Sequence, residues 1–265
     1  MPHVVVQRRD AVFEITLNRP EILNAVNRET IAALASAVAE AGDDRACRAV
    51  LLVGAGTHFC AGGDITMFAE MIRLTPAERQ KALYGIVDTL HPLLLRMRHM
   101  PKPVVAAVQG AAAGFGLSLV LAADLALAAE DAVFTSGYIH LGTSPAGGMT
   151  ATLPRIVGLK HAAELMLLGD RFDARRALEF GLVNRIVPAE KLAAEAAALA
   201  ARLAAGPTQA YGRTKALLQA TLGDGFDAQL RRETENFAAC AASEDFAEGV
   251  RAFLEKRAPV FMGRG

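Results

Sequence analysis

The chain has 265 residues, 52% of them hydrophobic and 21% charged, a composition that favours a folded protein with a large core over a disordered one. Lysine plus arginine and aspartate plus glutamate both number 28, and the formal net charge of zero argues against a general nucleic-acid or acidic-membrane surface. The 3 cysteines are widely spaced and give neither a disulfide framework nor a metal-binding pattern. They suit a reducing compartment, so we expect a cytoplasmic protein without a metal site.

The first half of the chain predicts strands that alternate with helices. Residues 4–8 and 12–17 form a hairpin, and a helix follows from its N-cap Asn27 to about residue 41, where Gly42 is its predicted stop. Further strands are predicted at residues 49–53, 104–109, 125–128 and 133–135, and further helices at residues 65–100 (restarting at Thr75-Pro76), 117–123 and 149–157. This alternation predicts an α/β layered core.

The last third of the chain predicts mostly helices. Their ranges are 161–168, 173–180, 190–205, 208–222, 227–242 and 243–256, with one short strand at 183–187. We divide the chain into a core of residues 1–200 and a C-terminal helical region of residues 201–265. Alanine-rich faces of the helical region would suit a subunit contact if they are exposed.

The apolar segments do not predict export or membrane insertion. Residues 1–10 lack a basic start followed by a long apolar stretch, so we expect no signal peptide. Gln109, several glycines and Asp124 interrupt the apolar run 104–129, which favours a strand followed by a helix over a membrane span.

Two glycine turns, each after an apolar strand, are candidates for ligand binding. The first is Ala61-Gly62-Gly63-Asp64, and the second is Gly114-Phe115-Gly116 at the start of a buried helix. Glycine lets a ligand approach the backbone, and the first N–H groups of a helix have no intrahelical partners. Such turns could supply two N–H groups to one oxygen, whereas tight packing of small residues is the alternative.

Two familiar motifs are incomplete. Gly54-Ala55-Gly56 follows a strand, but Phe59 stands where a dinucleotide-binding fingerprint needs its third glycine, and no acidic residue closes a second strand. Ser118 lacks the final glycine of a nucleophile elbow, because Val120 occupies that position. A dinucleotide-dependent dehydrogenase and a serine hydrolase are therefore the weaker alternatives.

Seven segments lie in the order and spacing of the crotonase (enoyl-CoA hydratase/isomerase) family, which the chain resembles over nearly its whole length. They are LNRPEILNAVN (17–27), HFCAGGD (58–64), KPVVAAVQGAAAGFG (102–116), AADLALAAEDAVF (122–134), LGTSPAGG (141–148), ALEFGLVNRIVP (177–188) and FLEKRAPVF (253–261). The resemblance implies a spiral of ββα turns that binds acyl-CoA, and a C-terminal helical region that packs around neighbours in homotrimers, or in hexamers of two trimers.

The same resemblance assigns the ligand contacts. It places the thioester oxygen between the N–H groups of Gly63 and Phe115, with coenzyme A as part of the substrate and no separate cofactor. The adenine end is expected along the main chain of Ile22, Ala61 and Ile65, beside Asp64. Asp64 is also the predicted cap of the next helix, with a catalytic role as its alternative. Lys256 and Phe261 match positions that often touch the nucleotide of a neighbouring subunit, although a solvated lysine is the alternative for Lys256. Glu21 replaces a basic residue of many relatives, which leaves one phosphate contact in doubt.

The residues at the usual acid positions are the main departure from the family. Typical hydratases of the family use two glutamates to activate water and to protonate the α-carbon. The matching positions hold Ser118 and Tyr138, and Ala146 occupies a third position where some isomerases and a dehalogenase branch carry an acid. Neither hydroxyl is a good base near neutral pH without a partner, so the two side chains either donate hydrogen bonds and position water or simply line a polar pocket.

We therefore take Gly63, Phe115, Ser118 and Tyr138 as candidate catalytic residues and expect poor hydration of crotonyl-CoA. His140 would share a strand face with Tyr138 if that segment is extended, and could act as a base. Isomerisation, decarboxylation of a malonyl-type thioester and thioester hydrolysis stay open. An acyl-CoA-binding protein without catalysis is the alternative from another class.

Overall fold

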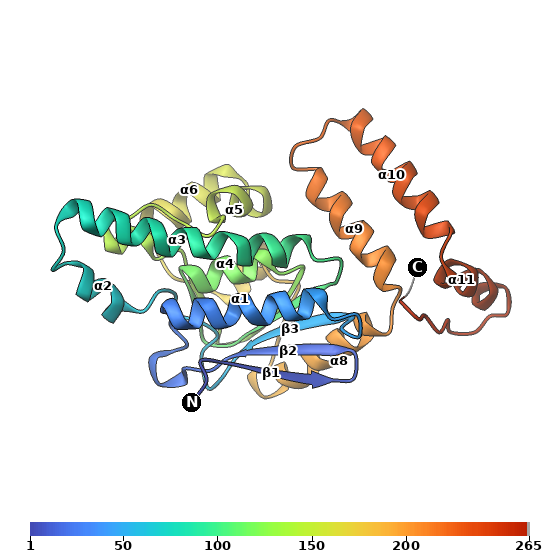
Figure 1. Ribbon diagram of the computed structural model, residues 1–265, viewed down its shortest axis with the longest axis horizontal. Helices are drawn as coiled ribbons and strands as arrows, with labels where there is room; N and C mark the ends of the chain where they lie inside the picture. The colour runs from blue at the N-terminus through green and yellow to red at the C-terminus, as the bar shows by residue number, and fades with distance from the viewer. Residues whose placement is uncertain (264–265) are drawn as a thin grey trace.

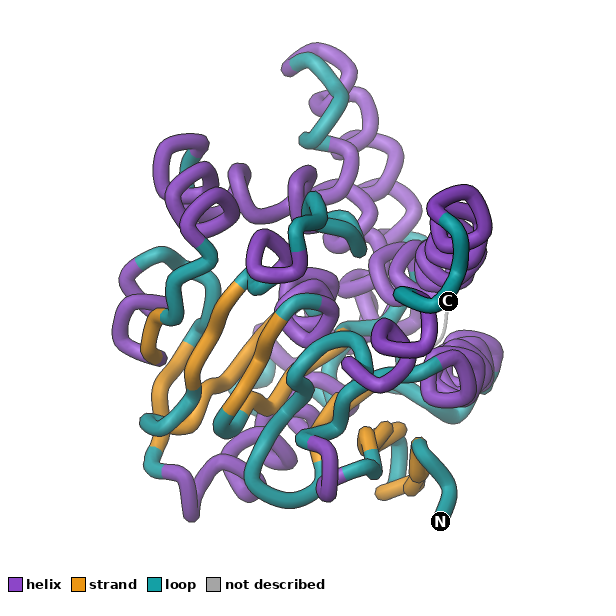
Figure 2. Tube along the Cα trace, turned by 90° about the vertical axis from the view of Figure 1, so that its left-hand side faces the viewer, coloured by secondary structure: helices purple, strands orange, loops and turns teal. Residues whose placement is uncertain are grey.

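A six-stranded sheet forms the centre of the computed structural model, which describes residues 1–263 (Figure 2). Its strands, in spatial order, are β1 (Val4–Arg9), β2 (Val12–Leu17), β3 (Ala49–Gly54), β4 (Val104–Val108), β6 (Leu125–Ala129) and β9 (Arg185–Val187). The β1–β2 hairpin is antiparallel and every other pair in this sheet is parallel. A second sheet joins β5 (Ala111–Ala113), β7 (Val133–Thr135) and β8 (Phe172–Asp173).

Alternating side chains of the central strands build two different apolar cores. Val50 and Leu52 of β3 face the larger core, which also takes in residues of α1 (Arg28–Asp43) and α3 (Pro76–His99). Leu51, between them, faces the other side of the sheet, where α8 (Leu192–Ala204) covers it. The strands are apolar on both faces because helices cover both sides, as parallel sheets require.

The remaining helices surround this core and extend from one end of it. They are α2 (Ile65–Met71), α4 (Phe115–Ala122), α5 (Met149–Val157), α6 (Leu159–Leu168), α7 (Ala174–Glu179), α9 (Thr208–Ala220), α10 (Phe226–Ala241) and α11 (Glu244–Leu254). Figure 1 shows α9 and α10 as an antiparallel pair that projects from the core, with α11 beyond them. Within residues 1–263, no helix combines the length and the apolar character that crossing a membrane demands.

The boundaries follow the predicted caps more closely than the predicted stops. The side chain of Asn27 accepts a hydrogen bond from Thr30 N, and Thr75 and Glu78 form the capping box that starts α3. The prediction that α1 stops at Gly42 was wrong, because the helix continues to Asp43. A distant residue caps this end, since Nζ of Lys102 donates to carbonyl groups in the last turn.

Two short segments differ from their predicted structure. The three alanines of residues 111–113, for which the sequence predicted no strand, form β5 and pair with β7. Tyr138–Leu141 is a 3-10 turn instead of an extended segment. In the C-terminal third, α8 extends across residue 200 and packs against the sheet along its whole length. The helices that leave the core therefore begin with α9. Residues 264 and 265 of the predicted helical region lie outside the described residues.

Candidate active site

The two glycine turns pack directly against each other. Between them, Cys60 N donates to Ala111 O at 2.9 Å and Ala113 N donates to Cys60 O at 2.9 Å, so the first turn continues alongside β5. A Cβ atom added to Gly62 would lie 3.0 Å from Ala113 O and 3.6 Å from the backbone nitrogen of Phe115. Gly62 also has φ of 97°, a conformation that favours glycine. The lack of a side chain therefore brings the two turns into contact.

Each turn presents a backbone N–H group without an acceptor. Phe115 is the first residue of α4, and its N-cap Gly114 provides no side-chain cap. Gly63 lies in a parallel bridge with Val26. The hydrogen bonds of this bridge run from Val26 N to Gly62 O and from Asp64 N to Val26 O, so Gly63 N takes no part in them. Among the described residues, neither Gly63 N nor Phe115 N has a hydrogen-bond partner. Two free donors, one at the positive end of a helix, suit an oxygen that gains negative charge.

Close packing fixes the position of both turns. A Cβ atom on Gly116 would lie well inside van der Waals contact distance of the Cys60 carbonyl oxygen, so α4 packs against the first turn with no room for a side chain. His58 orders the same turn, because its Nδ1 accepts a hydrogen bond from Ala111 N at 2.9 Å. The donors are therefore held by rigid backbone contacts.

Ser118 and Tyr138 meet beside this pair of turns. The Ser118 hydroxyl lies 3.3 Å and the Tyr138 hydroxyl 3.4 Å from the carbonyl oxygen of Ala146. A Cβ atom on Gly114 would lie 4.0 Å from Cζ of Tyr138, and one on Gly147 would lie 2.7 Å from the Ser118 hydroxyl. The loop that carries Ala146 thus covers Ser118, and the Tyr138 ring borders the start of α4.

The environment keeps Tyr138 a neutral phenol. Burial raises the pKa of Tyr138 above its ordinary value, although hydrogen bonds with Ser118 and Ala146 act in the opposite direction. A neutral phenol can donate a proton or a hydrogen bond but cannot remove a proton from carbon or water. No carboxylate occupies positions 118, 138 or 146, so the chemical groups here are hydroxyl and carbonyl.

Asp64 is a buried carboxylate next to the first turn, but its partners are structural. It caps α2 by accepting hydrogen bonds from the backbone and side chain of Thr66, and it pairs with Arg19 at 3.1 Å. Burial alone would raise the pKa of Asp64, but Thr66 and Arg19 outweigh it and hold the pKa below its ordinary value. An ionised, fully partnered aspartate is a poor candidate for a proton-transferring group.

The predicted placement of His140 was wrong. Because Tyr138–Leu141 is a 3-10 turn, His140 does not share a strand face with Tyr138. Its Nε2 lies 3.0 Å from the carbonyl oxygen of Gly169, at the end of α6. His140 therefore anchors the turn to α6 and does not reach the hydroxyl pair.

The expected adenine contacts line the edge beside the first turn. Ile22 ends a 3-10 turn, Ala61 N donates to Leu23 O at 3.0 Å, and Ile65 begins α2 with 60% of its surface exposed. Asn24 was missed from the sequence: it is 1% exposed, has φ of 55°, and its side chain donates to two carbonyl groups of the neighbouring turns. The signal for it was the residue type, since asparagine tolerates this conformation.

The remaining two candidates lie elsewhere in the chain. Figure 1 shows α2, which follows Gly63, at the opposite end of the long axis from α11, which precedes Lys256. Lys256 is exposed, and the Phe261 carbonyl accepts a hydrogen bond from Arg48 at 3.1 Å. Within one chain, the structure does not bring Lys256 or Phe261 to the glycine turns.

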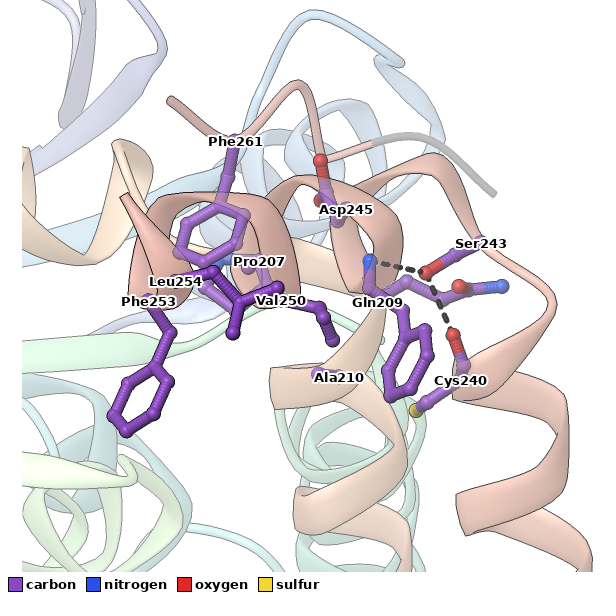
Figure 3. A pocket seen from close by; sticks show the side chains of 12 residues that line it. Pro207, Gln209, Ala210, Cys240, Ser243, Asp245, Val250, Phe253, Leu254 and Phe261 are labelled. Carbon is purple, nitrogen blue, oxygen red and sulfur yellow. Dashed lines mark hydrogen bonds between the residues drawn. The ribbon is translucent and has the colours of Figure 1, made fainter. Parts of the chain in front are cut away.

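An apolar hollow of about 400 Å³ lies in the C-terminal helical region (Figure 3). It is lined by residues of α9, α10, α11 and the tail, among them Pro207, Ala210, Val250, Leu254 and Phe261. Its carboxylate, Asp245, is occupied by the backbone N–H groups of Met262 and Gly263. This hollow lacks the free backbone donors of the glycine turns. Within residues 1–263, no three His, Cys, Asp or Glu side chains are grouped to hold a metal ion.

Comparison with known proteins decides the family. A sequence profile of the enoyl-CoA hydratase/isomerase family matches residues 7–264. The chain belongs to this family. The resemblance to the crotonase family seen in the sequence is thereby confirmed.

Relatives of this enoyl-CoA hydratase/isomerase family member match it from end to end. The 1,2-epoxyphenylacetyl-CoA isomerase of Escherichia coli K12 is 37% identical over 265 residues, which is 100% of both chains. The crotonyl-CoA hydratase of Syntrophomonas wolfei subsp. wolfei is 32% identical over 263 residues, 99% of this chain and 98% of that one. The crystal structure of an enoyl-CoA hydratase from Polaromonas sp. JS666 has a TM-score of 0.92 and 34% identity, and covers 97% of this chain and 99% of that one. These matches confirm the expected crotonase-like fold.

Proposed function

We propose that this family member acts on an acyl-CoA thioester whose carbonyl oxygen becomes enolate-like between the N–H groups of Gly63 and Phe115. The observation that carries the proposal is the contact of the two turns, 3.6 Å between a Cβ built on Gly62 and the nitrogen of Phe115, with both donors free. One preorganised donor of this kind is typically worth about 3 kcal/mol of barrier.

The proton chemistry is proposed to be atypical. Hydration needs a base for water, and the described site offers the neutral phenol of Tyr138 and the hydroxyl of Ser118. Decarboxylation of a malonyl-type thioester fits such a site, because loss of carbon dioxide itself leaves the electron pair that forms the enolate. Tyr138 could then protonate the α-carbon. Isomerisation, which the name of the Escherichia coli relative states for that protein, is the second reaction to test.

The decisive experiment compares two variants of the same residue. Phe115→Pro and Phe115→Ala both remove the ring, but only proline removes the N–H, and proline is well tolerated at the first position of a helix. Turnover is measured on enoyl-, malonyl-type and saturated acyl-CoA substrates. On any substrate that reacts, we expect Phe115→Pro to be about 100-fold slower than Phe115→Ala. Equal rates in the two variants would show that the Phe115 N–H does not stabilise an oxyanion.

Hydration is tested against a relative in the same assay. We expect this protein to hydrate crotonyl-CoA far more slowly than the Syntrophomonas wolfei crotonyl-CoA hydratase at equal concentration. Comparable rates would refute atypical catalysis. Binding of every thioester without turnover of any would favour the acyl-CoA-binding protein.

We also propose that the nucleotide site is completed in a homotrimer or hexamer, where Lys256 and Phe261 of a neighbouring copy approach the adenine end. In support, the C-terminal helices expose large apolar side chains, with Phe226, Phe237 and Phe253 at 77%, 75% and 83% exposed. Sedimentation at two concentrations tests the assembly. A monomer that binds acyl-CoA with full affinity would exclude this part of the proposal.

A further inference from the structure

The turn directly after α11 holds a lysine in a backbone conformation that glycine normally takes. Lys256 has φ of 54°, and its N–H donates to Phe253 O at 3.3 Å. Arg257 N donates to Ala252 O at 3.0 Å, and the two bonds together form a helix end whose left-handed residue is usually glycine. Lysine lacks the short polar side chain with which asparagine and aspartate tolerate this conformation. The strained backbone therefore points to a role for the Lys256 side chain.

A clamp of ion pairs keeps this turn in place. Nη1 of Arg257 lies 2.6 Å from one oxygen of Glu248 and Nη2 lies 3.1 Å from the other, so the pair is bidentate. Nε of Arg257 lies 2.6 Å from Glu255, so the side chains on either side of Lys256 are joined. Hydrogen bonding by Arg257 lowers the pKa of Glu248 to about 2, and the clamp is therefore charged at neutral pH.

The chain beyond the clamp is tied down as well. Val260 N donates to the same Glu248 carboxylate at 2.9 Å. The carbonyl oxygen of Phe261 accepts a hydrogen bond at 3.1 Å from Arg48, which directly precedes β3. Nε of Arg48 also donates to the hydroxyl of Thr208, at the start of α9, at 3.0 Å. The turn therefore has a fixed place relative to both α11 and the core.

The lysine side chain itself is left free. Lys256 is exposed, and among residues 1–263 its ammonium has neither an ion pair nor a hydrogen-bond acceptor. The nearest acidic residues along the helix, Glu248 and Glu255, are both bound to Arg257. An ammonium group that is held in one place without a counterion suits an anionic ligand such as a phosphate. A solvated lysine at a frayed helix end would explain neither the strained backbone nor the clamp.

We propose that Glu248 and Arg257 are positioning residues for Lys256. Their clamp holds the strained turn so that the ammonium meets a phosphate of the acyl-CoA that a neighbouring copy binds. This inference rests on the proposed function, which brings Lys256 to the nucleotide of a neighbouring copy. It adds that the contact is preorganised, so that affinity for the nucleotide depends on two residues that do not touch it.

Calorimetry with two ligands tests the clamp. Butyryl-CoA carries phosphates, whereas S-butyrylpantetheine presents the same thioester without any. We expect Lys256→Ala to weaken the binding of butyryl-CoA about tenfold and Arg257→Gln to weaken it about fivefold, with no change for S-butyrylpantetheine. The double variant should bind butyryl-CoA no more weakly than Lys256→Ala, because the clamp acts through the lysine. The matched control is Arg251→Gln, since Arg251 donates only to Ala247 O of its own helix, and it should change neither affinity.

A second pair of variants tests the strain. Lys256→Gly and Lys256→Ala both lose the ammonium, but only glycine adopts a positive φ freely. Lys256→Gly should unfold at a higher temperature than Lys256→Ala and should bind butyryl-CoA equally weakly. Equal unfolding temperatures would show that the turn holds no strain and would overturn the inference.

The outcomes separate the clamp from the function on which it rests. If the wild type does not bind butyryl-CoA, or if Lys256→Ala binds it as tightly as the wild type, the proposed nucleotide contact fails and the clamp fails with it. If Lys256→Ala weakens binding and Arg257→Gln does not, only the positioning role is overturned. The same holds if Arg257→Gln weakens the binding of both ligands equally, adds its loss to that of Lys256→Ala, or dissociates the assembly in sedimentation, because the clamp would then only support the fold.

Discussion

The ammonium group of Lys215 on α9 lies 2.7 Å from Oδ2 of Asp124, at the start of β6. The same oxygen accepts a hydrogen bond from Val104 N at 2.8 Å, and Nζ of Lys215 also donates to Met97 O at 2.7 Å. This ion pair, in which Lys215 is buried and Asp124 is partly exposed, joins the C-terminal helices to the central sheet and to α3. It is the kind of contact that a sequence pattern cannot predict, because the two residues belong to separate elements.

Removal of one partner of this pair should destabilise the protein strongly. Burial raises the pKa of Asp124 and lowers that of Lys215, so either charge left alone would carry its desolvation cost. Because Asp124 keeps some contact with solvent, we expect Lys215→Met to reduce the free energy of unfolding by about 1–3 kcal/mol. Addition of Asp124→Asn should recover part of that loss, as measured by urea unfolding. Additive losses in the double variant would contradict a direct coupling.

Gly116 should tolerate no side chain, whereas Gly85 should. A Cβ atom on Gly116 would overlap the Cys60 carbonyl oxygen, so Gly116→Ala must shift α4 or the first turn and should cost about 1–3 kcal/mol. Gly85, in the middle of α3, has no atom within 4 Å of an added Cβ. The control Gly85→Ala should stabilise the protein by about 0.5–1 kcal/mol. Thermal unfolding of both variants measures the contrast, and equal effects would contradict the packing argument.

The acid stability of the protein should depend partly on Asp64. The pKa of Asp64 in the folded protein lies below its ordinary 3.8, so its contribution is present above that value and is lost as the pH falls through the folded pKa. Asp64→Asn should lower stability by about 1–3 kcal/mol near neutral pH and should flatten the decline below about pH 4.

A second variant separates the ion pair from the helix cap. Arg19→Gln removes the same ion pair but leaves Asp64 to cap α2, so it should flatten the acid decline less than Asp64→Asn. The measurement is urea unfolding at a series of pH values. If stability declines with falling pH as steeply in Asp64→Asn as in the wild type, other carboxylates account for the decline.

Asp245 should protect the tail selectively. Its two oxygens accept the N–H groups of Met262 and Gly263 at 2.7 and 2.9 Å, whereas Val260 N donates to Glu248 at 2.9 Å. Asp245→Ala should therefore speed amide hydrogen exchange at Met262 and Gly263 and leave Val260 protected. The reciprocal Glu248→Ala variant removes the acceptor of Val260 N and should expose Val260 first. Uniform exchange along the tail in both variants would mean that it docks as one unit.

The sequence alone determined the features that depend on neighbouring residues. Asn27 and the Thr75–Glu78 pair cap helices because a side chain reaches a backbone N–H a few residues away. The apolar strands 104–108 and 125–129 were recognisable because both faces of the sheet are covered. The order of the seven segments also pointed to the correct family. These features depend on residues close together in the chain, so the sequence is sufficient to predict them.

Only the tertiary structure decided which groups meet. Lys102, from a distant loop, caps the end of α1 by donating to the carbonyls of Ala41 and Gly42. His140 turns toward Gly169, since its segment is a 3-10 turn. Ser118 and Tyr138 share the Ala146 carbonyl because a loop folds back over α4. Contacts between segments far apart in the chain depend on how whole elements pack, and no spacing of residues along one segment contains that information.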